Sequence, residues 1–283
     1  MKIEENCMQL EILLSCMNQV DTSLINKSGI VGNVLMINQC DKKDSKKLSK
    51  PFEESVHNTT PYVRVITTHE RGLSRSRNMA ILHSMGEICL LCDDDEQFKP
   101  DYQETILKAF QNLPQADIIA FDVTGKRTRL PQKIQRLGFF GCLKIASYQI
   151  AFRRKAILER NIKFDIYMGA GSGNGCGEEN KFLLDSLKAG LRLFYVPHTI
   201  ATVIPQKSTW FSGYNKSFFY QRGAATRYML GAGIALLYGV YYLAAKRHLY
   251  CSDISSLQAG IALIKGLWEN PIMQQIKRVV GEK

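Results

Sequence analysis

The chain has 283 residues and a net charge of +11 at pH 7, with 45% hydrophobic and 22% charged residues. This composition is that of a globular protein, and it excludes a disordered or fibrous chain. Eight cysteines without paired spacing exclude a small disulfide scaffold and favour a reducing, cytoplasmic compartment. The first nine residues contain Glu4 and Glu5 and no apolar run, so we expect no secretory signal.

Apolar runs alternate with helix-like stretches through the first two thirds of the chain. We expect strands at residues 11–16, 34–37, 63–67, 88–92 and 116–121, and helices at 74–84 and 102–112. Residues 41–61 are polar and predict a surface loop, and 191–196 predict a later strand that Pro197 ends. Strands that alternate with helices indicate an α/β fold with a mostly parallel sheet.

The tail has a different character. Residues 228–245 carry no charge and are flanked by Arg227 on one side and Lys246 and Arg247 on the other. Eighteen residues reach about 27 Å as a helix, close to the thickness of a bilayer core. A second helix is expected at 254–268. These helices would span a membrane, lie at its interface or be buried in the protein, and the tyrosines and basic flanks favour the interface.

The positive charge is concentrated in two segments. Residues 123–158 carry nine basic and no acidic residues, and residues 222–283 carry eight basic and three acidic residues. Clustered charge of this kind indicates an anionic partner, which is nucleic acid, anionic lipid or a phosphorylated substrate, unless the face is simply solvated. The first cluster contains few aromatic residues, and no RNA-binding signature is visible, so no nucleic-acid partner is expected.

A run of carboxylates, Asp93-Asp94-Asp95-Glu96, follows the apolar run 88–92 directly. Ligands of open α/β sheets bind at the carboxyl ends of strands. Adjacent aspartates repel one another, and a divalent cation would remove that repulsion. If this segment is extended, Asp93 and Asp95 point the same way and form a D-x-D unit. The alternative is a solvated surface loop.

Several ordered motifs resemble those of family 2 glycosyltransferases with a GT-A fold. They are the run Arg71-Gly72-Leu73-Ser74-Arg75-Ser76-Arg77-Asn78, then Gly86-Glu87-Ile88, the Asp93-Asp94-Asp95 run, Phe164-Asp165, Gly169-Ala170-Gly171 and Gly177-Glu178-Glu179-Asn180-Lys181-Phe182. Ser15-Cys16-Met17-Asn18 resembles the end of the family's first strand. Ser76 and Ala80 depart mildly from the family pattern. The resemblance covers roughly residues 10–210.

The resemblance implies a GT-A, Rossmann-like sheet flanked by helices over residues 1–221, with a C-terminal helical, membrane-associating extension at 222–283. It also implies a nucleotide-diphospho-sugar donor, a UDP-sugar being expected, and Mn²⁺ or Mg²⁺. Asp95 and Asp93 would hold the metal, and His198 is a weaker candidate ligand. The candidate donor-binding residues are Asn18, Asp41, Arg75, Arg77, Asn78, Asp93 and Asp94. For Arg75 and Arg77 the alternative is a salt bridge on a helix face.

An acceptor hydroxyl needs a general base. By its position in the family motif this base is Glu179, with Glu178 as second choice, and the alternative is a helix-capping role. A single displacement with inversion follows. We therefore expect an inverting, metal-dependent glycosyltransferase of the hexosyltransferase type. It would act on a lipid-linked glycan in cell-surface polysaccharide synthesis, as a peripheral cytoplasmic protein at the inner face of a bacterial membrane. The alternative is a non-catalytic GT-A-like binding protein.

Overall fold

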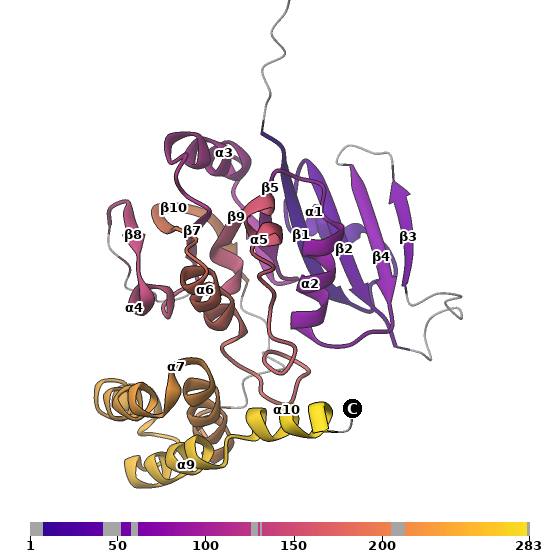
Figure 1. Cartoon of the computed structure of the whole chain (residues 1–283). Helices are drawn as coiled ribbons and strands as arrows, with labels where there is room; N and C mark the ends of the chain where they lie inside the picture. The colour runs from indigo at the N-terminus through magenta and orange to yellow at the C-terminus, as the bar shows by residue number, and fades with distance from the viewer. Residues whose placement is uncertain are drawn as a thin grey trace, which may run out of the picture. The chain divides into compact units, whose positions relative to one another are not determined.

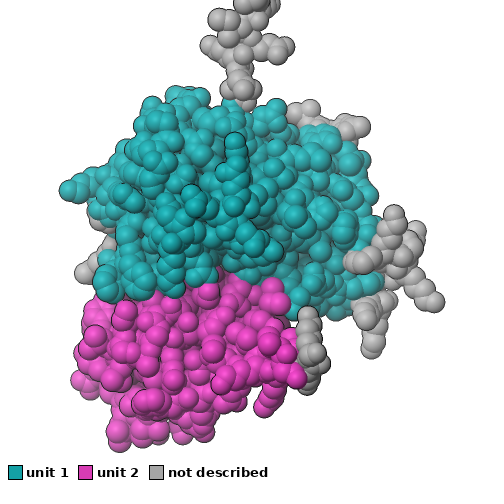
Figure 2. Space-filling model, in the orientation of Figure 1, with its two compact units in different colours: residues 1–164, 182–206 teal, residues 165–181, 207–283 magenta. Residues whose placement is uncertain are grey.

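The computed structural model describes residues 8–41, 52–57, 62–125, 130, 132–204 and 213–281. The chain divides into two compact units, coloured separately in Figure 2. The first unit comprises residues 1–164 and 182–206, and the second comprises 165–181 and 207–283. The predicted domain boundary between residues 221 and 222 falls inside a helix, α7 (Lys216–Ala245), and stays a prediction.

The first unit is built on a mixed sheet flanked by helices (Figure 1). Its strands are β1 (Leu10–Met17), β2 (Asn33–Gln39), β3 (Phe52–His57), β4 (Val63–Thr68), β5 (Ile88–Cys92), β6 (Glu96–Phe98), β7 (Ile118–Thr124), β8 (Gln135–Leu137), β9 (Ile150–Arg153) and β10 (Leu193–Val203). Their order is β3-β4-β2-β1-β5-β9-β7-β10-β6, and β8 pairs with β10. The neighbours β4, β2, β1 and β5 are parallel, as are β7 and β10, and the other pairs are antiparallel.

Helices connect these strands. They are α1 (Ser23–Lys27), α2 (Leu73–His83), α3 (Tyr102–Asn112), α4 (Phe139–Cys142) and α5 (Arg154–Glu159), with a 3₁₀ turn, η1, at Ser147–Gln149. The helix α6 (Glu178–Lys188) begins in the second unit and continues in the first. α2 packs on β1 and β2, and α3 packs on β10. The apolar faces of the sheet and of α3 form one core, which includes Ile12, Leu90, Phe110 and Phe121.

The predicted strands and helices of this unit are present, with two corrections. Residues 52–57 lie in the predicted surface loop but form the edge strand β3, which pairs antiparallel with β4. The rest of that predicted loop, apart from Asp41, lies outside the described residues. Pro197 does not end the later strand, because β10 continues to Val203. Its pairing with β7 shifts register between Val196 and Thr199, and a strand tolerates proline at such an irregularity.

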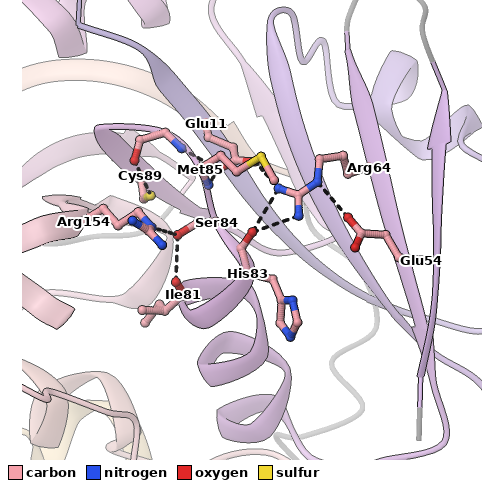
Figure 3. Close-up of polar contacts among 10 residues, drawn as sticks. Glu11, Glu54, Arg64, Ile81, His83, Ser84, Met85, Cys89 and Arg154 are labelled. Atoms are coloured by element: carbon pink, nitrogen blue, oxygen red, sulfur yellow. Dashed lines mark hydrogen bonds and ion pairs between the residues drawn. The ribbon is translucent and has the colours of Figure 1, made fainter. Parts of the chain in front are cut away.

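A buried polar cluster stabilises the start of β1 and the end of α2 (Figure 3). Arg64 of β4 donates two hydrogen bonds to the carbonyl oxygen of His83, at 2.9 and 3.0 Å. Its guanidinium also pairs with Glu11 at 3.4 Å and with Glu54 at 2.8 Å. Arg64 and Glu11 are both buried. The charge of Arg64 therefore caps a helix carbonyl and is neutralised by carboxylates, as a buried guanidinium requires.

Gly86 has a steric reason to be glycine. The Glu11 carboxylate accepts hydrogen bonds from the backbone N–H groups of Met85 and Gly86, the latter at 2.8 Å. A Cβ at position 86 would lie 2.6 Å from the Glu11 Cβ and 2.9 Å from its backbone nitrogen. The glycine of the Gly86-Glu87-Ile88 motif thus allows Glu11 to hold the turn that leads into β5.

Two arginines of the basic segment 123–158 have hydrogen-bond partners within the fold. Arg153 donates to the carbonyl oxygens of Ala116 and Phe110, each at 3.0 Å. Arg154 donates to Ser84 Oγ at 3.0 Å. Two of the nine basic residues of segment 123–158 therefore hold the fold together. The described cysteines form no disulfide bond with one another. Burial raises the pKa of Cys89 to about 12.

The second unit contains the tail helices. They are α7, α8 (Arg247–Tyr250), α9 (Ser256–Glu269) and α10 (Pro271–Gly281), and α7 packs along α9 (Figure 1). Among the described residues, α7 is the one helix that is long and apolar enough to cross a membrane, judged by length and composition alone. Gly231 interrupts it, however, with φ 78° and ψ 167°, so α7 consists of two helical segments. The predicted uncharged run 228–245 is therefore not one continuous helix.

Candidate functional site

The first unit gathers polar side chains at one edge of its sheet. β1, β2, β4 and β5 are parallel neighbours, so their carboxyl ends meet at the same edge. Asn18 directly follows β1, Asp41 comes two residues after β2, and Asp93 directly follows β5. This is the position at which open α/β sheets bind ligands.

Asn18 and Asp41 are in contact, as expected of residues that close adjacent strands. Asn18 Nδ2 donates to Asp41 Oδ2 at 3.1 Å, and Asn18 Oδ1 accepts from the Asp41 backbone N–H at 3.0 Å. Asn18 has φ 51°, a left-handed conformation that asparagine adopts more readily than most residues. Arg71 pairs with the Asp41 carboxylate and donates to the Gln39 carbonyl oxygen at 2.9 Å. The hydrogen bonds from Arg71 and Asn18 lower the pKa of the Asp41 carboxyl.

Asp93 is held from two elements. Arg77 Nη2 of α2 lies 2.9 Å from Asp93 Oδ1 and 3.1 Å from Oδ2. Ser147 Oγ of η1 donates to Oδ2 at 3.2 Å. The Arg77 side chain is 1% exposed, and that of Asp93 is 24% exposed. The carboxylate therefore keeps one solvent-facing side while its charge is compensated from the interior.

The rest of the carboxylate run is not extended. Asp94 and Asp95 form a turn between β5 and β6, so the alternation expected of an extended segment does not apply. Desolvation and the charges of Asp93 and Asp95 raise the pKa of the Asp94 carboxyl. Glu96 is buried, and its Oε1 accepts from the Asp93 backbone N–H at 3.1 Å. Its Oε2 has no hydrogen-bond partner among the described residues.

Asn78 holds a distant segment of the backbone. Its Nδ2 donates to the Phe164 carbonyl oxygen and its Oδ1 accepts from the Phe164 N–H, both at 2.8 Å. The Phe164 ring stacks on Phe182 with centroids 4.3 Å apart, and the Arg77 guanidinium lies 5.3 Å from the Phe164 centroid. The motifs that contain Asn78, Phe164 and Phe182 are far apart in the sequence and thus meet beside Arg77, the partner of Asp93.

Two predicted residues have surface partners. Arg75 pairs with Glu70 at 3.0 Å, and both side chains are exposed. The alternative to donor binding was a salt bridge on a helix face, and here the partner Glu70 lies just before α2. His198 Nε2 lies 3.7 Å from Asp101 Oδ2. Within the part of the chain that the structure describes, no three His, Cys, Asp or Glu side chains are grouped to hold a metal. A metal ion at the carboxylate run would therefore have few protein ligands.

The sequence decides the family. A sequence model of glycosyl transferase family 2 matches residues 12–173, which is more than half of the chain. The chain belongs to glycosyl transferase family 2. The predicted family resemblance is confirmed, and the fold is a mixed α/β GT-A-like fold with a central sheet flanked by helices. No curated protein matches the chain.

Solved structures share the fold of this family 2 chain at low sequence identity. S. aureus TarS 1–349 in complex with UDP matches with a TM-score of 0.56 and 11% identity over 85% of this chain and 73% of that one. Its complex with UDP-GlcNAc gives 0.53 and 13% over 92% and 72%. The mannosyltransferase PcManGT from Pyrobaculum calidifontis, in complex with GDP-Man and Mn²⁺, gives 0.52 and 13% over 97% and 80%.

The two glutamates of the family 2 motif open α6 and belong to the second unit. Glu178 is buried, whereas Glu179 is partly exposed. Both lie in the first helical turn, where the dipole favours carboxylates. Of the pair, Glu179 is thus the side chain that is more exposed to solvent. It remains our first choice for the base.

Three side chains of the candidate site were not selected from the sequence: Arg71 contacts Asp41, and Ser147 and Glu96 contact Asp93. Arg71 was visible inside a motif but was not assigned to the site. Of the two residues that contact Asp93, only Glu96 carried a signal, since it ends the run of four acids. Ser147 reaches Asp93 from 54 residues further along the chain, which spacing rules do not reveal.

Proposed function

We propose that this family 2 chain is an inverting, metal-dependent glycosyltransferase of the hexosyltransferase type. It transfers a sugar from a nucleotide-diphospho-sugar to a hydroxyl group. The observation that carries the proposal is Asp93, which closes β5 at the ligand-binding edge and is braced by Arg77 and Ser147 while one side faces solvent. Stability alone gives no reason to place three aspartates together at such an edge.

The donor's nucleobase and ribose are assigned to Asn18, Asp41 and Arg71, with Asp93 and Asp94 toward the sugar. A carboxylate and an amide with fixed orientations suit the donors and acceptors of a nucleobase edge. The similar TarS structure binds UDP-GlcNAc and the similar mannosyltransferase binds GDP-Man. We propose a UDP-sugar.

Asp93 and Asp95 are the proposed metal-holding residues, with Mn²⁺ or Mg²⁺ as the ion. The donor set fits because it consists of carboxylate oxygens, which these ions prefer, and donor phosphates would complete it. Burial, followed by repulsion from Asp93 and Asp95, raises the pKa of the Asp94 carboxyl, and a cation would relieve that repulsion. When bound, the ion supplies charge compensation for the departing nucleoside diphosphate. His198 is the least supported ligand, given its contact with Asp101.

Glu179 is the proposed general base. Its carboxylate takes the proton from the acceptor hydroxyl as that oxygen attacks the anomeric carbon. One displacement of this kind inverts the anomeric configuration. Glu178 is buried and is assigned to holding the start of α6 rather than to proton transfer.

We propose a lipid-linked glycan as the acceptor and cell-surface polysaccharide as the product. The proposed location is cytoplasmic and peripheral, at the inner face of the bacterial membrane. The support is the tail: a glycosyltransferase domain is followed by basic residues and one apolar candidate helix. We keep residues 1–221 as the transferase domain and 222–283 as the membrane-associating extension.

A donor panel tests the proposal. Thermal unfolding of the chain is followed with UDP-, GDP- and dTDP-sugars, each with Mn²⁺ and with EDTA, and sugar transfer or donor hydrolysis is measured in parallel. The expected result is stabilisation by a UDP-sugar that requires Mn²⁺, together with turnover of the same donor. Stabilisation without any turnover would instead support a non-catalytic GT-A-like binding protein, and no stabilisation by any donor would contradict both.

A further inference from the structure

The helix α9 presents an apolar stripe to solvent. Leu257, Ile261, Ile264 and Trp268 follow the spacing i, i+4, i+7 and i+11, which places them on one helix face. Their exposed fractions run from 45% for Ile264 to 75% for Leu257. Lys265 borders the stripe and pairs with Glu269 at 3.7 Å, while the four stripe positions themselves are apolar. Exposed apolar surface of this extent is unusual for a water-facing helix and marks an interaction site.

The opposite face of α9 contacts α7 most closely through small residues, and Leu263 and Leu267 are buried beside them. A Cβ at Gly266 would collide with the Tyr220 carbonyl oxygen, and a Cβ at Gly223 would collide with that of Leu263. Ala259 and Ala262 are buried on the same helix. The pair therefore packs backbone against backbone, which is how helices associate in a lipid environment.

The second segment of α7 follows the same rule. Ala235 and Gly239 are buried, whereas the large apolar side chains on its other face are exposed. These exposed side chains are Ile234, Leu236, Leu237, Val240 and Tyr241. Tyr242 of α7 and Leu263 of α9 are also buried, so the pair is apolar on its exposed faces as well as inside, whereas helices of a soluble bundle expose a polar face.

Charge distinguishes between the surfaces that could cover these faces. Residues 213–281 carry eight basic and two acidic residues, a net charge of +6. Lys246 and Arg247 follow α7 and Lys277 lies on α10, and Arg247 and Lys277 are exposed. The Arg227 guanidinium lies 5.3 Å from the Trp268 ring centroid, a pairing of basic and aromatic groups that suits the headgroup level of a bilayer. A second copy of the chain would bring +6 against +6, whereas anionic lipid is complementary.

We infer that the exposed faces of α9 and of the second segment of α7 insert into one leaflet of an anionic phospholipid bilayer. Gly231 limits the second segment of α7 to residues 232–245, about 21 Å of helix, short of the roughly 30 Å needed for a span. The insertion is therefore shallow and from one side. This inference deepens the proposed membrane location and depends on it, but not on the donor, the metal or the base.

Flotation of the full chain with vesicles tests the inference. The vesicles contain phosphatidylcholine alone or with 30% phosphatidylglycerol (about one lipid in three). The double variant Leu257→Glu/Ile261→Glu places two carboxylates in the stripe. Its matched control, Ser256→Glu/Gln258→Glu, makes the same charge change at exposed positions of α9 outside the stripe. We expect the stripe variant to lose at least tenfold in vesicle partitioning relative to the control, because two apolar side chains that enter the bilayer are replaced by charged ones.

The depth of insertion is read from Trp268. With Trp210→Phe as background, Trp268 is the single tryptophan, and its emission should shift to the blue on vesicle addition and be quenched by lipid with brominated tails. Equal flotation of the stripe variant and its control would overturn the inference. So would a wild-type dimer that the stripe variant dissociates while vesicle binding persists. Donor stabilisation by Mn²⁺ and nucleotide-sugar, measured on the same variants, separates failure of this inference from failure of the proposed enzyme.

Discussion

Arg77 Nη2 donates to both carboxylate oxygens of Asp93, at 2.9 and 3.1 Å, from a side chain that is almost fully buried. The sequence offered Arg77 as a ligand for donor phosphates or as half of a salt bridge on a helix face. In the structure Arg77 forms a buried salt bridge from α2 to Asp93, a candidate metal ligand. The positive charge of Arg77 compensates the Asp93 carboxylate, so we expect Arg77 to influence the site by positioning Asp93.

Replacing Arg77 should therefore affect both folding and the site. Arg77→Gln leaves Asp93 without its cation, and we expect a loss of about 2–3 kcal/mol in the free energy of unfolding, because hydrogen bonds to charged groups carry about that much. Urea denaturation measures it. Arg75→Gln on the same helix breaks only the exposed pair with Glu70 and should cost at most about 1 kcal/mol. Equal losses for the two variants would contradict the bracing role.

Gly86→Ala tests the packing of Glu11 against the turn before β5. The added Cβ would approach the Glu11 Cβ to 2.6 Å, and overpacking of this kind costs about 1–3 kcal/mol. Gly138→Ala is the control, since no atom lies within 4 Å of a Cβ there and its φ is −101°. Thermal unfolding of both variants measures the difference in their stability. If Gly86→Ala is as stable as Gly138→Ala, the steric explanation of the motif fails.

Asp41→Asn should weaken donor binding by about 10- to 100-fold if the Asn18–Asp41–Arg71 cluster holds the nucleobase, since a charge-assisted hydrogen bond contributes about 1.5–3 kcal/mol. Asp21→Asn is the control, because Asp21 is a surface residue that accepts from the Ser23 N–H. Isothermal titration with the donor gives both affinities. Unchanged affinity for Asp41→Asn would remove the cluster from the binding site.

The ionisation of Asp41 is a separate prediction. Its folded-state pKa lies below the ordinary 3.8, through hydrogen bonds from Arg71 and Asn18. The carboxylate is therefore charged above that value, and its favourable interactions disappear only as the pH falls through the lowered pKa. Arg71→Gln should raise the pKa toward 3.8, which a carbon-13 titration of the side chain detects. A titration curve that does not move would show that Arg71 does not stabilise the charged form.

The close packing of α7 and α9 predicts opposite effects for two glycines. Gly266→Ala forces the helices apart at the Tyr220 carbonyl and should destabilise the second unit by about 1–3 kcal/mol. Gly233→Ala adds a methyl group where no atom lies within 4 Å, and alanine's helix propensity should stabilise by up to about 1 kcal/mol. Hydrogen-exchange protection of the α9 amides, measured in each variant, distinguishes destabilisation from stabilisation of the second unit. Similar protection in both variants would contradict the backbone contact.

Sequence reasoning succeeded where the pattern is local and apolar. The run 88–92 is β5, and the spacing over 102–112 is α3, at the predicted bounds. It failed where tertiary context dominates. β3 is polar and pairs with a single neighbour at the sheet edge, so it lacks the apolar run of a central strand. Pro197 sits at a register shift that only the pairing with β7 reveals.

The site shows the same division. Adjacent parallel strands brought Asn18 and Asp41 together, which strand order alone predicts. Asn78 was expected at the donor but hydrogen-bonds the backbone of Phe164, 86 residues away. Periodicity and spacing do not report contacts at that separation. The motif residue Asn78 therefore has a structural role, holding the backbone at Phe164, that becomes visible only in the fold.

The central claim is that Asp95 and Glu179 do the chemistry of sugar transfer. Single-turnover transfer with Mn²⁺ tests it in Asp95→Ala and Glu179→Gln, against Glu159→Gln, a surface glutamate paired with Lys155. The account predicts losses of at least roughly 100-fold in the first two variants, as general-base and metal roles imply, and an unchanged rate in the third. Wild-type rates in both Asp95→Ala and Glu179→Gln would contradict it.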